Sequence, residues 1–144
     1  MADHTFTVRL SMEVDAPIGR VWRLMTDIHR WPQWHPLLGS VSGELTVGGR
    51  LVTRLRTGEE RSAEVLEAEL DEPHRFVYAA GDPAGVIGRH SWTLTELDPG
   101  TTRGDNEESF SGPGVSHMTD QMRAGILAQQ QAIIAAFKRA VESV

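Results

Sequence analysis

The sequence contains no cysteine and a single lysine, Lys138, among 14 basic residues. Without cysteine the chain has no disulfide bond, cysteine-ligated zinc, iron–sulfur cluster or thiol nucleophile. The remaining basic residues are arginines, and the formal net charge is −6. Nucleic-acid binding requires a dense cationic face, which an acidic chain of this kind lacks. We therefore expect no nucleic-acid partner.

Long apolar runs are also missing. No stretch approaches the length of about 18 apolar residues that a membrane-spanning helix requires. The opening MADHTFTVRL carries an acid at position 3 and no apolar run, unlike a secretory signal. These features predict a cytoplasmic protein with no membrane span. A length of 144 residues suits one hydrophobic core, so we interpret residues 1–144 as a single domain.

The patterns of three common catalytic sites are absent. The chain has no HExxH pattern, so we expect no metal. Its glycines between positions 81 and 88 lie between predicted strands and do not precede a helix, unlike a phosphate-binding loop. The segment GSVSG at 39–43 has valine where a nucleophile elbow requires serine. These observations argue against a metal site, a bound nucleotide and covalent serine catalysis.

Most of the chain has the pattern of β-strands. Residues 4–14 alternate between apolar and polar side chains, as in a strand with one buried face. Short segments ending in Gly, Pro and Asp then predict six more strands, whose close spacing favours antiparallel neighbours. These strands are predicted at 40–47, 50–57, 61–70, 74–80, 86–97 and 101–111.

Three helical segments complete the pattern. Residues 17–26 predict a short helix beginning at Pro17, with Asp15 as a cap, and residues 27–36 predict a short helix or turn. Residues 117–142 have apolar side chains at helical spacing, and Thr119 or Ser116 is available as the N-cap. This last helix, at about 39 Å, is the only one long enough to cover the sheet. A curved sheet around a single helix leaves a space between them, where small molecules bind.

Three segments carry a family resemblance that extends over essentially the whole chain. They are VDAPIGRVWRLMTDIHRWPQWHP at 14–36, GRHSWTL at 88–94 and TTRGDNEESFSG at 101–112. Together they resemble the START-like superfamily (SRPBCC, Bet v 1-like), in particular its polyketide cyclase/dehydrase group. The resemblance implies an α+β helix-grip fold. In this fold a seven-stranded curved antiparallel sheet surrounds a long C-terminal helix, and two short helices follow strand 1.

Two residues depart from the family pattern. His35 stands where the family often has asparagine, and Gly104 stands where an aliphatic residue is usual. A glycine inside a strand suggests a bulge or room for a ligand.

Strand alternation predicts which polar residues face the cavity. Glu108 shares a face with Asn106 and Phe110, His90 shares one with Trp92, and Tyr78 lies on the same face as Phe76. A buried carboxyl and imidazole titrate near neutrality when their environments shift them, which suits acid–base catalysis. We therefore predict catalytic roles for Glu108 and His90, and ligand-binding roles for Tyr78, Trp92, Asn106 and Phe110.

Four further ligand-binding residues are predicted from the chemistry of their side chains. Trp34 suits an apolar wall, and Arg54 suits an anionic oxygen of a ligand. Met118 and Met122 suit adaptable cavity walls. Each role has a structural alternative. Glu108 also suits an ion pair with Arg54 or Arg123, His90 and the methionines suit core packing, and Arg54 suits a solvated outer face.

The sequence and the resemblance together favour a cytoplasmic protein that holds a small hydrophobic or polyketide-like molecule. A cofactor-free cyclase or dehydratase using Glu108 or His90 is the first hypothesis. The alternatives are a non-catalytic ligand or lipid carrier or sensor, and a co-chaperone-like interaction domain, because this fold alone does not decide function. We expect a monomer or a homodimer, the latter through an exposed edge near residues 40–47.

Overall fold

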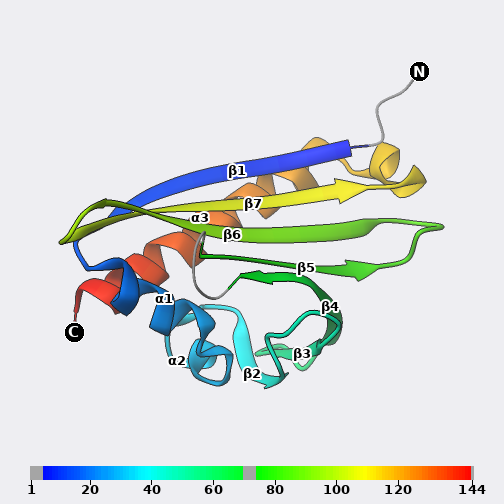
Figure 1. Cartoon of the computed structure of the whole chain (residues 1–144). Coiled ribbons are helices and arrows are strands. Elements are labelled where there is room, and N and C mark those ends of the chain that lie inside the picture. Colours follow the sequence, from blue (N-terminus) through cyan, green and yellow to red (C-terminus); the bar gives the residue numbers. More distant parts are fainter. Residues whose placement is uncertain (1–4, 70–73, 144) are drawn as a thin grey trace.

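The computed structural model describes residues 5–69 and 74–143, which form an α+β helix-grip fold. Seven antiparallel strands form one curved sheet in the order β1-β7-β6-β5-β4-β3-β2 (Figure 1). The strands are β1 (Thr5–Val14), β2 (Leu38–Gly43), β3 (Arg50–Leu55), β4 (Glu60–Glu69), β5 (Arg75–Gly81), β6 (Ile87–Asp98) and β7 (Thr101–Ser111).

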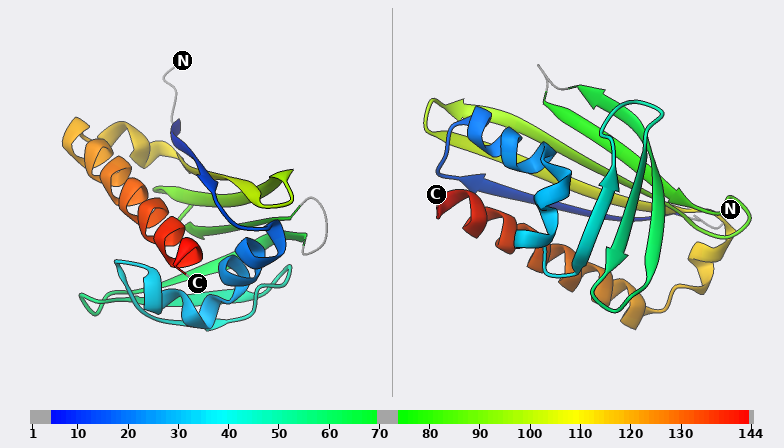
Figure 2. Two further views of the ribbon diagram at one scale, coloured as in Figure 1. Left: turned by 90° about the vertical axis from the view of Figure 1, so that its left-hand side faces the viewer. Right: turned by 90° about the horizontal axis from the view of Figure 1, so that it is seen from below.

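The first and last strands of the chain are neighbours in the sheet. Strand β1 pairs with β7 along its whole length, from Thr5 opposite Ser111 to Val14 opposite Thr102. The other strands follow one another as hairpins, which agrees with the predicted meander. The sheet bends around helix α3 (Asp120–Glu142), as the two views of Figure 2 show.

Short helices lie at both ends of the sheet, those that follow β1 at one end and the segment after β7 at the other (Figure 1). Helix α1 (Ile18–Thr26), the 3₁₀ helix η1 (Ile28–Arg30) and α2 (Trp31–Trp34) follow β1, and η2 (Pro113–His117) precedes α3. The N-cap of α1 is Pro17, which makes no side-chain cap, so the prediction of a cap by Asp15 is wrong. The backbone N–H of Asp15 instead donates to the Glu142 carboxylate of α3, 2.9 Å away.

Helix α3 is anchored by its C-terminal half. It begins at Asp120, three residues later than predicted, and the Thr119 hydroxyl accepts from the Met122 N–H at 3.1 Å as a cap. Its buried residues all lie beyond position 129: Gln130, Ile133, Ala136, Phe137 and Val141. From Asp120 to Gln129 no residue is buried, although the Arg123 guanidinium lies 4.9 Å from the centre of the Phe6 ring of β1. This part of the helix therefore packs less closely on the sheet than the C-terminal part.

The tightly packed core lies at the end of the sheet that α1 covers. Val14, Val21 and Phe76 are fully buried there, with Phe137 of α3. Gly104 lies in this region, and a Cβ built on it would meet the Met12 side chain at 2.8 Å. Pairing on both sides of Gly104 is regular. The prediction of a bulge or ligand space at Gly104 is thus wrong, because Met12 fills that position.

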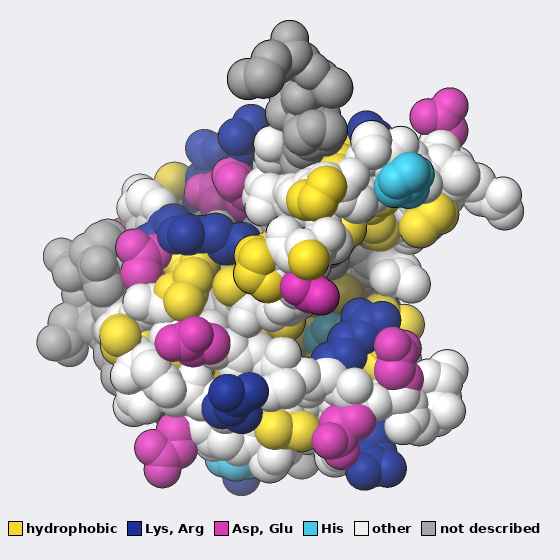
Figure 3. Space-filling view, turned by 90° about the vertical axis from the view of Figure 1, so that its right-hand side faces the viewer, with side chains coloured by type: hydrophobic (Ala, Val, Ile, Leu, Met, Phe, Trp, Pro, Cys, Tyr) yellow, Lys and Arg dark blue, Asp and Glu magenta, His cyan; other side chains and the backbone are white. Residues whose placement is uncertain are grey.

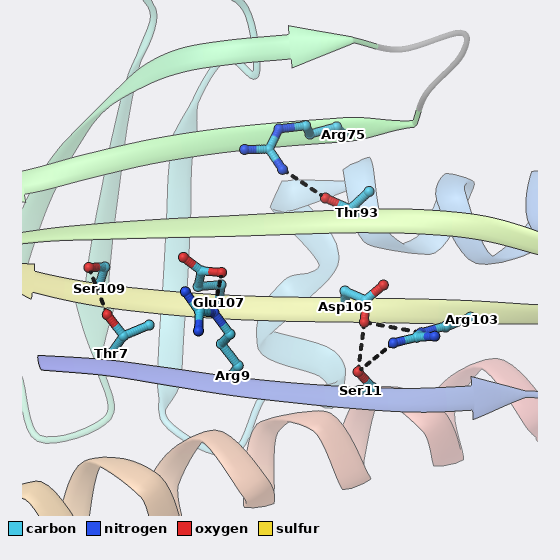
Figure 4. A network of polar contacts seen from close by, with 9 residues as sticks. All are labelled: Thr7, Arg9, Ser11, Arg75, Thr93, Arg103, Asp105, Glu107 and Ser109. Carbon is cyan, nitrogen blue, oxygen red and sulfur yellow. Dashed lines mark hydrogen bonds and ion pairs between the residues drawn. The ribbon is translucent and has the colours of Figure 1, made fainter.

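The outer face of the sheet is polar. Figure 4 shows neighbouring strands joined there by Arg9 with Glu107, Ser11 with Asp105, and other pairs that point away from α3. These contacts are exposed, so each adds little stability. Their role is to keep this face hydrated while the opposite face is apolar.

Some boundaries differ from the predicted ones. Strand β2 lies at the sheet edge, as expected, but it ends at Gly43 and does not reach residue 47. Gly43 has φ of 112°, a conformation that favours glycine and stops the strand. Residues 4 and 70 of the predicted strands, and the predicted turn at 71–73, lie outside the described residues. Within 5–69 and 74–143, no helix has the length and apolar character to cross a membrane.

Candidate functional site

A cavity of about 520 Å³ lies between the sheet and α3. Aromatic residues supply much of its wall: Trp31, Trp34, Tyr78, Trp92, Phe110 and Phe137. Figure 3 looks into the hollow at this end of the molecule, with a histidine inside it and a basic side chain at its edge. This volume falls in the range of small-molecule sites, which combine apolar walls with a few polar groups.

Three polar side chains form a row across the cavity wall. Strand register places Tyr78 of β5 opposite His90 of β6, and His90 opposite Glu108 of β7. The Tyr78 hydroxyl lies 2.9 Å from Nδ1 of His90, and a Glu108 oxygen lies 3.3 Å from the same nitrogen. All three side chains line the cavity.

A fourth residue holds the imidazole from behind. The Asn106 side-chain amide donates to Nε2 of His90 at 2.7 Å. With Nε2 as acceptor, the proton of a neutral ring lies on Nδ1, where it is directed to the Tyr78 oxygen and Glu108. The tyrosine hydroxyl hydrogen is then free to be donated to a ligand.

Helix α3 contributes through Gln130. Gln130 is buried, and its side-chain nitrogen donates to a Glu108 oxygen at 2.9 Å. One carboxylate oxygen is therefore held by the helix and the other by the sheet. This double attachment fixes the orientation of the carboxyl group in the cavity.

Burial shifts the acid–base properties of the row. It raises the pKa of Glu108, although the Gln130 hydrogen bond and the Arg61 charge partly oppose this. It lowers the pKa of His90 to about 4, with the Asn106 hydrogen bond acting in the opposite direction. Burial and the Glu108 charge both raise the pKa of Tyr78. Near neutral pH, His90 is uncharged and Tyr78 stays protonated, while Glu108 has an increased tendency to bind a proton.

The structure brings most of the predicted site residues to the cavity. Glu108, His90, Tyr78, Trp34, Trp92 and Phe110 line it. Asn106 is buried behind His90 and does not line the cavity, so it positions the imidazole. The alternative ion pairs of Glu108 are not formed, because Arg54 pairs with Glu60 and Arg123 donates to the carbonyl oxygens of Met118 and Val115.

Arg54 lies outside the cavity. Its neighbours on β3, Thr53 and Leu55, line the cavity, so alternation directs Arg54 to the solvated face, where it bonds to Glu60 at 3.0 Å. Arg61 on β4 is the arginine that lines the cavity. It pairs across the strands with Thr53 and therefore shares the inward face. The same alternation rule identifies Arg61 once the register of β3 and β4 is known.

The two predicted methionines also lie outside the cavity. Met122 is 53 % exposed, and Met118 precedes α3 and is partly exposed. Both belong to residues 118–129, none of which is buried. Helical periodicity correctly identified the apolar face of α3 but not where along the helix the contact with the sheet begins.

Two further cavity residues were missed, His35 and Gln130. His35 differs from the asparagine usual in the family, which was a signal that the sequence did carry. Gln130 is one of three consecutive glutamines, and nothing in the sequence separates the buried one from its neighbours. In the described part of the chain, no group of three or more His, Cys, Asp or Glu is arranged to hold a metal ion.

We expect acid to destabilise the fold through His90. The folded-state pKa of about 4 lies below the ordinary 6.5, so the unfolded chain binds a proton first as pH falls. This stability is complete above about pH 6.5 and is lost as pH falls towards 4. Between about pH 7 and 4.5, urea unfolding should show a loss about 2 kcal/mol larger in wild type than in His90→Gln. Equal losses in the two proteins would contradict this role for His90.

Comparison with solved structures supports the fold. Zhui aromatase/cyclase from a Streptomyces species has a TM-score of 0.76 at 18% identity, covering 96% of this chain and 94% of that chain. Truncated norcoclaurine synthase from Thalictrum flavum has a TM-score of 0.73 at 15% identity, covering 98% and 96%. A protein from Mesorhizobium loti has a TM-score of 0.77 at 21% identity, covering 96% and 98%. At these identities the likeness shows the fold alone.

A search of curated proteins found no match. The family model described as "Polyketide cyclase / dehydrase and lipid transport" matches residues 5–142, nearly the whole chain. This match agrees with the helix-grip architecture and with the resemblance of the three sequence segments. The chain belongs to the polyketide cyclase / dehydrase and lipid transport family.

Proposed function

We propose that this protein binds a flat, oxygenated, largely apolar molecule and moves a proton at a carbon next to a carbonyl group. The observation that carries the proposal is the row of Tyr78, His90 and Glu108 on the wall of a 520 Å³ cavity. The family contains cyclases and dehydrases as well as lipid transporters. The chemistry proposed here requires only groups that the chain itself supplies.

Glu108 is the base. Its carboxyl group lines the cavity, and burial raises its pKa towards the range in which a carboxylate accepts a proton effectively. It removes a proton from the carbon next to the carbonyl, leaving an enolate, and returns that proton, or one from solvent, to carbon in the reverse step. The negative charge of the enolate lies on its oxygen.

Tyr78 stabilises that oxygen. Its hydroxyl keeps its proton because burial and Glu108 raise its pKa, and Nδ1 of His90 holds its oxygen at 2.9 Å. A donor positioned in this way before the reaction stabilises charge that develops during it. His90 and Asn106 act behind Tyr78 by fixing its orientation.

The test measures proton exchange on a simple ketone, 2-acetylnaphthalene, in D₂O. Proton NMR follows the loss of the methyl signal next to the carbonyl, with and without protein. The proposal predicts faster exchange with wild-type protein than in buffer containing an equal concentration of the Glu108→Gln variant. Binding without any acceleration would contradict proton transfer, and failure to bind would contradict the pocket assignment as well.

A non-catalytic carrier is the second candidate, favoured by the apolar aromatic lining and by the transport proteins in the family. It predicts that native mass spectrometry finds a co-purified apolar molecule that remains chemically unchanged after incubation with the protein. Release of an altered molecule would favour the enzyme. The co-chaperone alternative predicted a filled core, and the cavity does not favour it.

A further inference from the structure

The cavity contains a second hydrogen-bonding group, His35, which the proton-transfer row does not use. His35 follows α2 and belongs to a different wall from strands β5 to β7, which carry Tyr78, His90 and Glu108. Its position is set by the loop on which it lies. The side chain therefore has a fixed place in the cavity before any ligand enters.

The backbone around His35 is held on two sides. Its N–H donates to the Trp31 carbonyl at 2.7 Å, which ends α2. On the other side the Arg56 guanidinium donates to the carbonyl oxygens of Pro32 at 2.8 Å and Pro36 at 3.3 Å. Arg56, which directly follows β3, thus fastens the loop that carries His35.

The tautomer of His35 is set by the same loop. Its Nδ1 accepts the backbone N–H of Leu37 at 3.1 Å, so in the neutral ring the proton lies on Nε2. Burial, together with the Arg56 charge, lowers the pKa of His35 to about 4, so the ring is neutral at physiological pH. His35 thus presents one N–H donor and no charge.

The Nε2–H group is free to meet a ligand. Among the described residues no hydrogen-bond partner is found for this nitrogen, and it is not among the buried polar atoms that lack one. The two ring nitrogens lie on different edges of the imidazole, so Nε2 is directed away from the Leu37 backbone. His35 and His90 both line the cavity, on different walls.

We propose that His35 is a specificity-determining residue whose Nε2–H binds a second oxygen of the ligand, distant from the carbonyl at which Tyr78 and Glu108 act. The inference rests on the proposed function and narrows its substrate class. The ligand is then a flat apolar molecule with two separate oxygen functions. A cation at the second position is disfavoured because the neutral Nε2–H is a donor only.

Two substitutions separate binding from loop structure. In His35→Asn the side-chain oxygen occupies the place of Nδ1 and keeps the Leu37 contact, but nothing reaches the position of Nε2. In His35→Gln the amide nitrogen reaches the position of Nε2, while the contact with Leu37 is lost. A residue important only for the loop would tolerate asparagine better than glutamine. A residue that binds the ligand would show the reverse order.

The experiment compares 2-acetylnaphthalene with its 6-hydroxy and 7-hydroxy derivatives, which add a second oxygen at two positions. Quenching of tryptophan fluorescence reports the dissociation constants, since Trp31, Trp34 and Trp92 line the cavity. We expect wild type to bind one hydroxy derivative about 5-fold more tightly than the parent, the typical effect of one hydrogen bond. His35→Asn should lose this preference and His35→Gln should keep it, each preference being the ratio of the dissociation constants of the parent and hydroxy compounds measured on the same protein.

The outcomes distinguish this inference from the function on which it rests. If the preference is equal in wild type and His35→Asn, or is absent in wild type although the parent binds, the role of His35 is wrong and the pocket stands. If no compound binds to wild type, the proposed function itself fails. Circular dichroism and thermal melting of both variants check that any change in binding is not a loss of fold.

Discussion

Replacing Glu108 with glutamine is expected to slow deuterium exchange on 2-acetylnaphthalene by about 100-fold or more. A positioned acid–base group contributes on the order of 10² to 10⁴ in rate. Glutamine keeps the size of the side chain and an oxygen to accept from Gln130, which now bonds to Glu108 at 2.9 Å, but it does not accept a proton from carbon. Binding of the ketone should therefore change little while the exchange rate falls.

The pH profile gives a second measure of the same residue. The base form of Glu108 is the carboxylate, so exchange should increase as pH rises through its pKa, which burial raises above the ordinary value. A profile already flat down to the pH range of an exposed carboxyl group would contradict a buried base. The Tyr78→Phe variant is the matched control, because it removes the oxygen-stabilising hydroxyl but leaves the carboxylate and the midpoint of the rise.

Replacing Phe137 with alanine is expected to cost about 3 to 5 kcal/mol of unfolding free energy. Phe137 is fully buried on α3 and packs edge-on against Trp34, with ring centroids 5.0 Å apart, and against Trp92 at 5.9 Å. It connects the helix to both the loop and the sheet. Its loss removes these contacts and extends the existing cavity.

The control for Phe137 is Leu127→Ala on the same helix. Leu127 is 39 % exposed and lies in the part of α3 that has no buried residue, Asp120–Gln129, so its loss should cost below about 1 kcal/mol. Urea unfolding of the two variants gives the comparison. Similar costs would contradict the difference in packing between the two parts of the helix.

The architecture was accessible from the sequence because its signals are local. Alternation in residues 5–14 and 101–111, short turns, and one long helix determine the order of the elements. Alternation also brings Tyr78, His90 and Glu108 to one face, and antiparallel pairing then makes them neighbours. Strand alternation and antiparallel pairing of consecutive strands were therefore sufficient to predict that Tyr78, His90 and Glu108 lie together.

The remaining site residues depend on information that periodicity does not contain. Arg61 faces the cavity because of the register between β3 and β4, and turn residues alone did not fix that register. Gln130 contacts Glu108, and Met122 is exposed, because of how α3 is placed against the sheet. Long-range geometry of this kind arises from packing of the whole core.

The central claim is that a ligand-sized cavity lies between the sheet and α3. A large side chain that fills this cavity from the sheet side tests it most directly. Gly88 lines the cavity, and a Cβ built on it has only ordinary contacts, the nearest 3.5 Å from the Phe110 ring. Gly104 provides the matched control, since its Cβ would meet Met12 at 2.8 Å in the packed part of the core. The two glycines therefore compare a position with room for a Cβ and a position without it on one face of the sheet.

The measurement is thermal melting together with binding of 2-acetylnaphthalene for Gly88→Phe and Gly104→Phe. The hollow predicts that Gly88→Phe melts within a few degrees of wild type and binds the ketone at least about 10-fold more weakly. Gly104→Phe should lose about 1 to 3 kcal/mol or more through overpacking. Unchanged binding in Gly88→Phe, or destabilisation equal to that of Gly104→Phe, would contradict a ligand-sized space between the sheet and the helix.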